Sequence, residues 1–324
     1  MNTLSRPVIR QMNEWGAAQK PFVFLFDFDC KQCRIWEDGT ETAELLWRSP
    51  NAQNFSPHPH PWKPVSWQVE PVSEQRYQRA FDLVQHEVHS GNSFLLNLTM
   101  PSQVATNLSL TEIAHRSTSN YLVFLKNKFV CFSPEIFVRI ENGRISSYPM
   151  KGTIDALLPN AEHLLKTNYK ELAEHHTIID LIRNDLSQVA EQVEVARFCY
   201  LDEVKSNQGK LLQMSSEISG RLPENYRSHL GDIFARLLPA GSITGAPKKK
   251  TVEIIKTAEQ YDRGWYTGIF GRFDGSNVDS CVLIRYLEQN GKHFTFKSGG
   301  GITHLSRCHD EYHELIRKVY VPIT

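Results

Sequence analysis

The sequence predicts an α+β fold with large, mainly antiparallel sheets packed with helices. Runs rich in aliphatic and aromatic residues follow one another along the 324-residue chain, without the steady strand–helix alternation that indicates a parallel sheet. Two pairs of these runs are separated by Asn142-Gly143 and Asn290-Gly291. Asn-Gly is the strongest short-range signal of a β-hairpin, and a hairpin joins antiparallel strands.

The first seventy residues differ in composition from the rest. They contain one apolar run, PFVFLFDF, and a connector rich in proline and histidine, SPHPHPWKP. Proline lacks a backbone N–H and cannot continue a helix or a strand ladder, so the connector predicts a boundary. We expect residues 1–70 to form a short strand-containing segment packed on the core, and residues 71–324 to form the main domain.

A helix and a strand open this second part. Ser73 is a favourable N-cap, apolar residues recur at helical spacing from Tyr77 to Val88, and Gly91 ends the pattern. The run SFLLNLT then predicts a strand. Further strands are expected in YLVFLK, KFVCF, EIFVRI, RISSYP, QVEVARFCYL, YTGIFGRF, SCVLIRYLE and KHFTFK. Helices are expected in KELAEHHTIIDLIRNDL, TVEIIKTAEQ and HDEYHELIRK.

Charge and hydropathy exclude several classes of partner. Lysine plus arginine and aspartate plus glutamate each total 36, and the longest block of one sign is Lys248–Lys250, so neither a nucleic acid nor a membrane surface is indicated. The sequence lacks an apolar run of roughly 18 to 20 residues, and its N-terminus lacks the apolar core of a signal peptide. We expect a cytoplasmic protein whose partner is a small molecule.

Six scattered cysteines indicate reduced thiols rather than a disulfide framework. Two patterns resemble fragments of zinc sites. Cys30 and Cys33 lack the second pair of ligands that a structural zinc needs. His309 and His313 are one helical turn apart, but their segment carries a stronger carboxylate pattern. Zinc is therefore not expected at either place.

A lysine stands between chain-breaking residues in PMKGT, at the end of an expected strand. If the turn at Asn142-Gly143 has three residues, Glu135 lies opposite Pro149, and Lys151 is the diagonal neighbour of Glu135 on the same face. If the turn has two residues, Glu135 lies opposite Met150, and a regular pleat directs Lys151 to the other face. Lys151 is either a partner in an ion pair at the end of the hairpin or a reactive amine.

Two helical segments each carry two glutamates that are three residues apart. The pairs are Glu171 with Glu174 and Glu311 with Glu314. Adjacent carboxylates repel unless a cation lies between them, and four carboxylates from two helices are hard oxygen ligands that suit Mg²⁺. The alternative is that each pair lies on a solvated helix face.

Two glycine-containing segments are candidates for anion binding. In PAGSITGAPKKK, residues Gly241 to Gly245 precede Pro247, a typical first residue of a helix, and free N–H groups at a helix N-terminus attract anions. The glycine run in SGGGIT could form an anion-binding nest. The spacing of a nucleotide-binding P-loop is missing. Nucleotide binding and a merely flexible loop stay as alternatives.

In this order, the motifs resemble those of the chorismate-utilising enzymes. The matching segments are FSPEIFVRI, PMKGT, KELAEHHTIIDLIRNDL, GSITGAPKKKTVEII, YTGIFG, CVLIR and SGGGIT followed by DEYHELIRK, within roughly residues 75–320. The resemblance implies an α+β fold with large antiparallel sheets, a chorismate-binding catalytic domain, and Mg²⁺ anchoring a carboxylate of chorismate. The family includes anthranilate, aminodeoxychorismate, isochorismate and salicylate synthases.

Lys151 distinguishes the branches of this family. Anthranilate synthases resemble the chain but carry alanine at this position, whereas aminodeoxychorismate synthases carry the lysine as a nucleophile. Isochorismate and salicylate synthases place a water-activating lysine in the segment matching SFLLNLT, where this chain has Leu95. The chain therefore resembles component I of aminodeoxychorismate synthase, which makes the precursor of 4-aminobenzoate for folate. Anthranilate or isochorismate synthesis and a non-catalytic chorismate-binding subunit stay as alternatives.

The resemblance implies catalytic roles for two residues. Glu135 would protonate the departing C4 hydroxyl of chorismate, and Lys151 would add to C2. Ammonia would then attack C4 and displace the lysine. A nucleophilic lysine must be uncharged, which costs about 4 to 5 kcal/mol at pH 7 unless burial or a nearby metal lowers its pKa.

The resemblance also implies residues that hold the metal and the substrate. Glu174 and Glu314 would bind Mg²⁺ directly, and Glu171 and Glu311 would bind it directly or through water. The expected substrate-binding residues are Thr153, Thr244, Gly245, Tyr266, Arg285, Gly299, Gly300, Lys318 and Gln213. Gln213 departs from the family, in which histidine is common, and an amide cannot transfer protons at neutral pH.

Two expectations concern regulation and the source of nitrogen. Longer relatives form a tryptophan pocket with an extended N-terminal region, and only residues 1–70 precede the matching part here, so tryptophan feedback is not expected. None of the cysteines stands in the Gly-x-Cys-x-Gly motif of a glutaminase. The expected partner is therefore a separate glutamine amidotransferase subunit that supplies ammonia. Without length for a fused pyridoxal-phosphate lyase, the expected product is aminodeoxychorismate.

Overall fold

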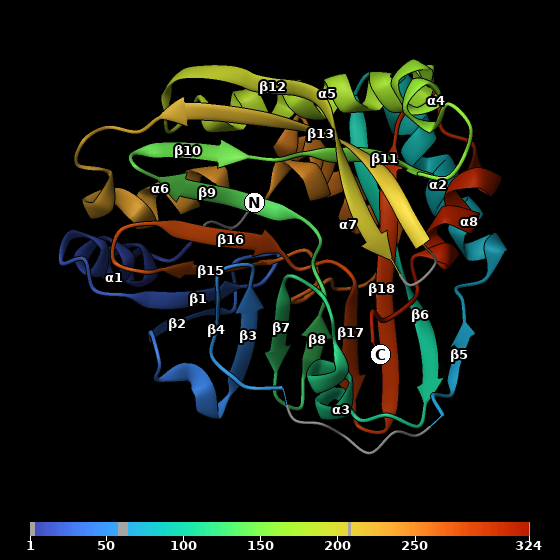
Figure 1. The fold of residues 1–324 in the computed structure, drawn as a ribbon. Coiled ribbons are helices and arrows are strands. Elements are labelled where there is room, and N and C mark those ends of the chain that lie inside the picture. Colours follow the sequence, from blue (N-terminus) through green and yellow to red (C-terminus); the bar gives the residue numbers. More distant parts are fainter. Residues whose placement is uncertain (1–3, 58–63, 207–208, 324) are drawn as a thin grey trace.

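The computed structural model of the chain describes residues 4–57, 64–206 and 209–323. Within these residues the strands form two nine-stranded sheets, and each of their pairings is antiparallel (Figure 1). In Figure 1 the strands of the first sheet run across the view, and those of the second sheet run up the view. The predicted α+β class with large antiparallel sheets is confirmed.

The two sheets draw their strands from distant parts of the chain. The first has the order β11-β13-β10-β9-β16-β15-β1-β2 with β12 paired to β13, and the second β14-β6-β18-β17-β8-β7-β3-β4 with β5 paired to β6. The strands of the first are β1 (Phe22–Phe26), β2 (Cys33–Glu37), β9 (Ile136–Glu141), β10 (Arg144–Ser147), β11 (Met150–Asp155), β12 (Glu191–Ser206), β13 (Gly209–Arg221), β15 (Ile269–Phe273) and β16 (Val278–Val282). Those of the second are β3 (Leu45–Ser49), β4 (Ala52–Gln53), β5 (Trp67–Glu70), β6 (Leu95–Thr106), β7 (Leu122–Leu125), β8 (Phe129–Cys131), β14 (Gly245–Ala246), β17 (Tyr286–Asn290) and β18 (His293–Ile302).

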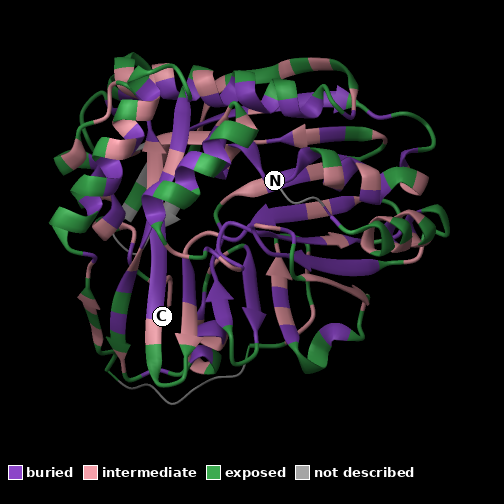
Figure 2. Ribbon diagram, turned by 180° about the vertical axis from the view of Figure 1, so that it is seen from behind, coloured by how far each residue is buried: buried purple, intermediate pink, exposed green. Residues whose placement is uncertain are grey.

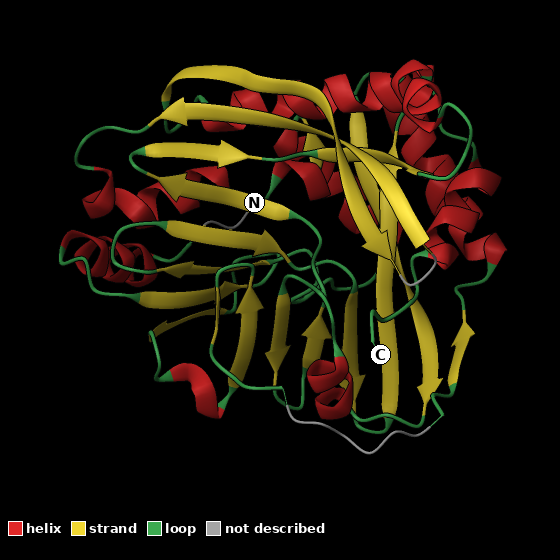
Figure 3. Ribbon diagram, viewed as in Figure 1, coloured by secondary structure: helices red, strands yellow, loops and turns green. Residues whose placement is uncertain are grey.

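Helices cover the outer faces of both sheets (Figure 3). They are α1 (Arg6–Ala17), α2 (Glu74–His89), α3 (Leu110–Arg116), α4 (Ala161–Thr167), α5 (Tyr169–Leu186), α6 (Leu230–Leu237), α7 (Lys248–Glu259) and α8 (Cys308–Arg317). Helix α5 packs on β11, β12 and β13 of the first sheet, whereas α8 packs on β18 of the second. None of the described helices is long and apolar enough to cross a bilayer.

Strand β1 is buried on both faces, between the helices of the first sheet and the second sheet. All five of its side chains are buried, and Figure 2 shows buried residues along the strands of both sheets. Phe22, Phe24 and Phe26 pack with apolar residues of α1, α5 and α6, whereas Val23 and Leu25 pack between the sheets. A strand that is covered on both faces reads as a continuous apolar run, and each such side chain contributes about 1.5 to 3 kcal/mol when fully buried.

The first hairpin adopts the shorter of the two expected turns. Glu141 pairs with Arg144, so the turn contains Asn142 and Gly143, with φ of 51° and 75°. Positive φ at both residues is typical of a type I′ turn, and the three-residue alternative is wrong. Beyond the hairpin, β10 and β11 follow one another along β13, so Lys151 pairs with Met214 of that strand.

Two features of the fold differ from the sequence-based expectations. The run SCVLIRYLE, expected as one strand, forms β16 in the first sheet and β17 in the second. The chain passes between the sheets at Leu283–Arg285, and Arg285 has a φ of 53°. Helices α1, α3, α4 and α6 have no counterpart among the expected elements. The first seventy residues contribute β1 and β2 to one sheet and β3, β4 and β5 to the other.

Candidate active site

Helix α5 presents two of the expected glutamates to the end of the first sheet. The side chain of Asn168 caps the helix by accepting a hydrogen bond from the backbone N–H of Glu171. Ile178, Ile179 and Ile182 on one face join the apolar core. Glu174 is buried on the side that faces β11, and Glu171 is half-buried. Amphipathicity therefore places a buried carboxylate beside the strand that carries Lys151.

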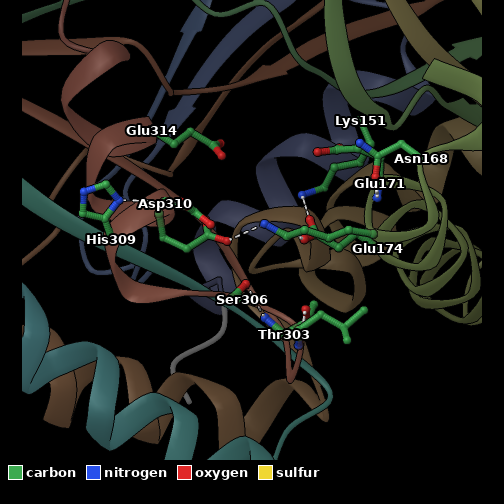
Figure 4. Close-up of polar contacts among 12 residues, drawn as sticks. Lys151, Asn168, Glu171, Glu174, Thr303, Ser306, His309, Asp310 and Glu314 are labelled. Carbon is green, nitrogen blue, oxygen red and sulfur yellow. Dashed lines mark hydrogen bonds and ion pairs between the residues drawn. The ribbon is translucent and has the colours of Figure 1, made fainter. Parts of the chain in front are cut away.

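Helix α8 presents the second pair from the opposite side. Its residues Tyr312 and Leu315 pack in the core of the second sheet, while Glu311 is buried and Glu314 is half-buried. Figure 4 shows Glu314 on one side of the site and Lys151, Glu171 and Glu174 on the other. Two sequence segments about 140 residues apart thus contribute carboxylates to one place.

Lys151 forms an ion pair with Glu174. Its Nζ lies 2.9 Å from Glu174 Oε2 and donates a hydrogen bond to it. Burial lowers the pKa of Lys151, but the Glu174 carboxylate, with Glu314 and Glu171 beyond it, raises that pKa above its ordinary value. These contacts therefore hold Lys151 as an ammonium, which differs from the expected uncharged amine.

Glu135 lies just before β9 and is held by the loop that precedes α7. One of its carboxylate oxygens accepts a hydrogen bond from the hydroxyl of Ser242. Burial raises the pKa of Glu135, and the hydrogen bond from Ser242 and the positive charges of Lys151 and Arg285 only partly offset this. A raised pKa favours the protonated form, which a general acid needs. Among the described ion pairs, Lys151 contacts Glu174 rather than Glu135. The alternative in which Lys151 and Glu135 form an ion pair at the end of the hairpin is therefore wrong.

Lysines occupy the space between the expected metal-binding carboxylates. Lys170 Nζ lies 2.9 Å from Glu311 Oε1 and 3.9 Å from Glu174 Oε1. Lys318 Nζ lies 2.6 Å from Glu314 Oε1. Burial favours a raised pKa for Glu314, but the positive charges of Lys318, Lys151 and Lys170 together hold that pKa below its ordinary value. In this arrangement the described residues contain no group of three or more acidic, histidine or cysteine side chains positioned to hold a metal.

The donor set nevertheless fits Mg²⁺. Carboxylates from α5 and α8 already face one cation, the Lys170 ammonium, and oxygen atoms are the ligands that Mg²⁺ prefers. A Cβ on Gly300 would lie 3.5 Å from Glu311 Oε2 and 3.6 Å from Glu314 Oε1, so the absent side chain leaves space beside both carboxylates. Glu171, Glu174, Glu311 and Glu314 would hold the ion once the lysines have shifted.

A match to the family described as chorismate binding enzyme covers residues 19–324. The chain belongs to the chorismate binding enzyme family. A Pasteurella multocida protein described as an uncharacterized PabA-like protein is 50% identical over 321 residues, which cover 97% of this chain and 98% of that protein. Aminodeoxychorismate synthase component 1 of Escherichia coli is 32% identical over 285 residues, which cover 83% of this chain and 61% of that protein.

Solved structures of two other proteins are similar in fold. The menaquinone-specific isochorismate synthase of Escherichia coli superimposes with a TM-score of 0.73 at 16% identity, covering 97% of this chain and 80% of that one. Anthranilate synthase component I of Streptococcus pneumoniae superimposes with a TM-score of 0.64 at 23% identity, covering 79% of this chain and 59% of that one. Both confirm the chorismate binding enzyme fold.

Several positions expected to bind substrate in this chorismate binding enzyme lie beside the carboxylates. Lys318 Nζ donates to the carbonyl of Gly299 at 2.8 Å, and a Cβ on Gly300 would lie 3.7 Å from the same nitrogen. Burial and the nearby Arg285 lower the pKa of Lys318. Among the described residues, the buried Nε of Arg285 has no hydrogen-bond partner, which is unusual for a buried donor.

Other expected substrate-binding residues have different surroundings. The hydroxyl of Thr244 donates to the carbonyl of Ala240, and Tyr266 is buried in the apolar layer between the sheets. Gly245 must lack a side chain, because a Cβ there would lie 1.8 Å from the carbonyl oxygen of Leu95. Gln213 is half-buried on β13 and pairs with Thr153, whose side chain lies outside the described part of the structure.

Four residues of the site carry no specific role in the sequence-based expectations. They are Lys170, Ser242, Gly301 and His175. A Cβ on Gly301 would lie 3.3 Å from Lys151 Nζ, so this glycine makes room for the amine. His175 is buried with Nε2 2.7 Å from Ser216 Oγ, and burial lowers its pKa to about 4, so it is neutral at pH 7. Of these contacts, only the spacing of Lys170 and Glu174, four residues apart on a helix, is visible in the sequence.

Proposed function

We propose that this chorismate-binding enzyme is component I of an aminodeoxychorismate synthase. In the cytoplasm it would aminate chorismate at C4, with Mg²⁺ and ammonia, to give 4-amino-4-deoxychorismate for 4-aminobenzoate and folate synthesis. The observation that carries the proposal is the position of Lys151. Its amine contacts the buried Glu174 at the carboxylate-lined site, and the same amine acts electrostatically on the pKa of Glu135.

The chemistry assigns complementary tasks to these two residues. Hydroxide is a poor leaving group, so the C4–O bond of chorismate breaks as Glu135 donates its proton and water departs. The lone pair of uncharged Lys151 forms a bond to C2, and both ring double bonds shift by one position, from C1=C2 to C1=C6 and from C5=C6 to C4=C5. Ammonia then attacks C4, both double bonds shift back, and the C2–N bond breaks so that Lys151 leaves as an uncharged amine. Two displacements thus restore the original positions of the double bonds.

The site must release the proton of Lys151 before this attack. The Glu174 carboxylate stabilises the ammonium, which raises the pKa of Lys151. When bound, Mg²⁺ would supply positive charge to the carboxylates and anchor a carboxylate of chorismate. Glu174 and Glu314 would be its direct ligands, and Glu171 and Glu311 would bind directly or through water. Glu174 would then no longer favour the charged form of Lys151.

Ammonia would come from a separate glutamine amidotransferase subunit. The nucleophile of a glutaminase is a cysteine thiolate, which requires a lowered pKa. Burial instead raises the pKa of every cysteine in the chain, to about 12 at Cys30 and Cys33 and about 11 at Cys308. Arg285 and Lys318 would bind the carboxylates of chorismate, and Gly299 and Gly300 would allow its close approach.

A product assay tests the proposal. The purified chain is incubated with chorismate, Mg²⁺ and an ammonium salt, and the product is identified by mass and fluorescence. We expect aminodeoxychorismate, no reaction when glutamine replaces ammonium, and a loss of at least about a hundredfold in rate for Lys151→Ala. Anthranilate or isochorismate as the product would overturn the proposal, as would chorismate binding without turnover. Unchanged turnover of Lys151→Ala would show that Lys151 is not the nucleophile.

A further inference from the structure

Lys170 connects the two halves of the carboxylate site. It is the second residue of α5, its Nζ contacts Glu311 of α8 at 2.9 Å, and it lies 3.9 Å from Glu174 of its own helix. The other two lysines of the site have different partners, since Lys151 contacts Glu174 and Lys318 contacts Glu314. Within the described residues, Lys170 is therefore the one ammonium that joins carboxylates of both helices.

The burial of the three side chains is unequal. Glu174 and Glu311 retain 6% and 3% of their side-chain exposure, whereas Lys170 retains 34%. Two buried carboxylates would be strongly destabilising without a counter-ion, because the loss of hydration favours their neutral forms. Lys170 supplies positive charge to Glu311 and, together with Lys151, to Glu174. It does so from the solvent side, and its flexible four-carbon chain can withdraw toward water.

The local backbone does not itself favour a cation at this position. Lys170 lies in the first turn of α5, where the helix dipole favours negative rather than positive charge. The contacts with Glu174 and Glu311 compensate for this unfavourable position. A divalent ion that takes the same two carboxylates would therefore remove the interactions that hold Lys170 in place.

We propose that Lys170 is a built-in competitor of the divalent metal, which neutralises Glu174 and Glu311 in the metal-free protein and swings outward when the ion binds. This inference rests on the metal site of the proposed function and adds a residue that controls its occupancy. Lys170 keeps its proton throughout, so the exchange is one of position rather than of charge state. Metal binding then has to displace an existing ion pair, which weakens the apparent affinity of the site.

The alternative role of Lys170 predicts the opposite effect. If Lys170 fixed the orientation of the carboxylates around a bound ion, its removal would weaken metal binding. If it is a competitor, its removal strengthens metal binding and destabilises the metal-free protein. The sign of the change in affinity therefore separates the two roles.

The experiment measures Mn²⁺ binding to the full chain without chorismate, by the electron paramagnetic resonance signal of the free ion. The variant is Lys170→Met, which keeps the length of the side chain and removes its charge. The matched control is Lys166→Met, because Lys166 lies near the end of the preceding helix α4 and pairs with the exposed Glu162 at 2.7 Å. We expect Lys170→Met to bind Mn²⁺ about three- to tenfold more tightly than the unsubstituted chain, and Lys166→Met to bind it equally well.

Thermal melting gives a second readout that does not depend on activity. Without metal, Lys170→Met should melt about 2 °C or more below the unsubstituted chain, and saturating Mn²⁺ should reduce this difference. Weaker or unchanged Mn²⁺ binding by Lys170→Met would overturn the inference while leaving the metal site intact. Equal tightening in Lys166→Met would overturn it too, because a general charge effect would then suffice. If the unsubstituted chain and Lys170→Met both fail to bind Mn²⁺, the metal site and the inference fall together.

Discussion

Glu135 depends on a residue that lies 107 positions away in the sequence, Ser242. The hydroxyl of Ser242 donates to one carboxyl oxygen, so the acidic proton of Glu135 is directed to the other oxygen. This arrangement fixes which oxygen faces the substrate in the proposed reaction. Ser242 is thus a positioning residue whose effect on catalysis operates through the orientation and the pKa of Glu135.

Replacing Ser242 by alanine should change both the orientation and the pKa of Glu135. The hydrogen bond from Ser242 stabilises the charged carboxylate, so its loss should raise the pKa of Glu135 further. A general acid works only when protonated, and activity falls as pH rises through its pKa. The high-pH limb of the kcat profile should therefore move to higher pH, and kcat at pH 7 should fall about tenfold or more because the carboxyl is no longer held in place.

Ser242→Thr is the matched control, because it keeps the hydroxyl. It should retain the position of the high-pH limb and most of kcat. Steady-state rates with ammonium as the nitrogen source, measured across the pH range, give the comparison. A limb that stays in place or moves to lower pH in Ser242→Ala would contradict the role of this hydrogen bond.

Residues whose chemistry is visible in their type and local spacing could be predicted from the sequence. The glutamate pairs of α5 and α8 belong to this class, since their spacing places each pair along one side of a helix. The Lys170–Glu311 and Ser242–Glu135 contacts do not, because the partners lie 141 and 107 positions apart. Such contacts depend on how the layers pack, and no local pattern records them.

At the scale of elements, the hairpin of β9 and β10 connects the two catalytic regions. Glu135 precedes its first strand, and the chain continues from its second strand into β11, which carries Lys151. The type I′ turn fixes the register of this connection, since a shift by one residue would exchange the faces of the strands. Asn-Gly predicted the hairpin because both positions require positive φ.

Gly143→Ala should destabilise the protein by about 1 to 2 kcal/mol, as measured by urea unfolding. Gly143 has a φ of 75°, which an alanine side chain disfavours. Tyr226 Cε1 lies 4.0 Å from the position of the added Cβ, so the cost arises from the backbone rather than from a clash. Asn142→Gly provides the control and should cost less, because glycine readily adopts the φ of 51° found there. Equal stability of Gly143→Ala and the unsubstituted chain would contradict this account.

The positions of strands along the chain could be predicted more completely than the way in which the strands pair. Apolar runs such as PFVFLFDF and YLVFLK predict strands because buried β-strands require them, and both form strands here. The split of SCVLIRYLE into β16 and β17 could not be seen, because both halves are apolar and the change of sheet occurs at Leu283–Arg285 without a proline or glycine. A change of sheet is a property of the packed molecule rather than of the local sequence.

At the scale of the whole molecule, the candidate site joins two layers. Helix α5 belongs to the layer of the first sheet, and α8 belongs to the layer of the second. The strand order of the sheets alternates between distant segments, and sequence patterns do not specify which strands meet. The meeting of the two glutamate pairs could therefore be inferred from a family resemblance but not from periodicity.

A divalent ion held by both helices should stabilise the folded protein. The unfolded chain cannot bring Glu174 and Glu314 together, so binding favours the folded state. At a Mg²⁺ concentration a hundredfold above its Kd, the stabilisation should be about 2.7 kcal/mol, which raises the melting temperature by several degrees. Differential scanning fluorimetry with EDTA and with Mg²⁺ measures this increase.

Glu314→Gln should abolish most of the Mg²⁺-dependent increase, because it removes a proposed direct ligand on α8. Comparing each variant with and without Mg²⁺ cancels the separate effect of leaving Lys318 without its partner, which lies 2.6 Å from Glu314. Glu162→Gln is the control, since its side chain is exposed and contacts only the solvent-facing Lys166 among the described ion pairs. It should keep the full increase. Helices α5 and α8 are anchored in different layers, and an ion held by both would link them. Loss of the Mg²⁺-dependent increase in Glu314→Gln alone would support this link. An equal loss in both variants would indicate non-specific binding of cations to surface carboxylates.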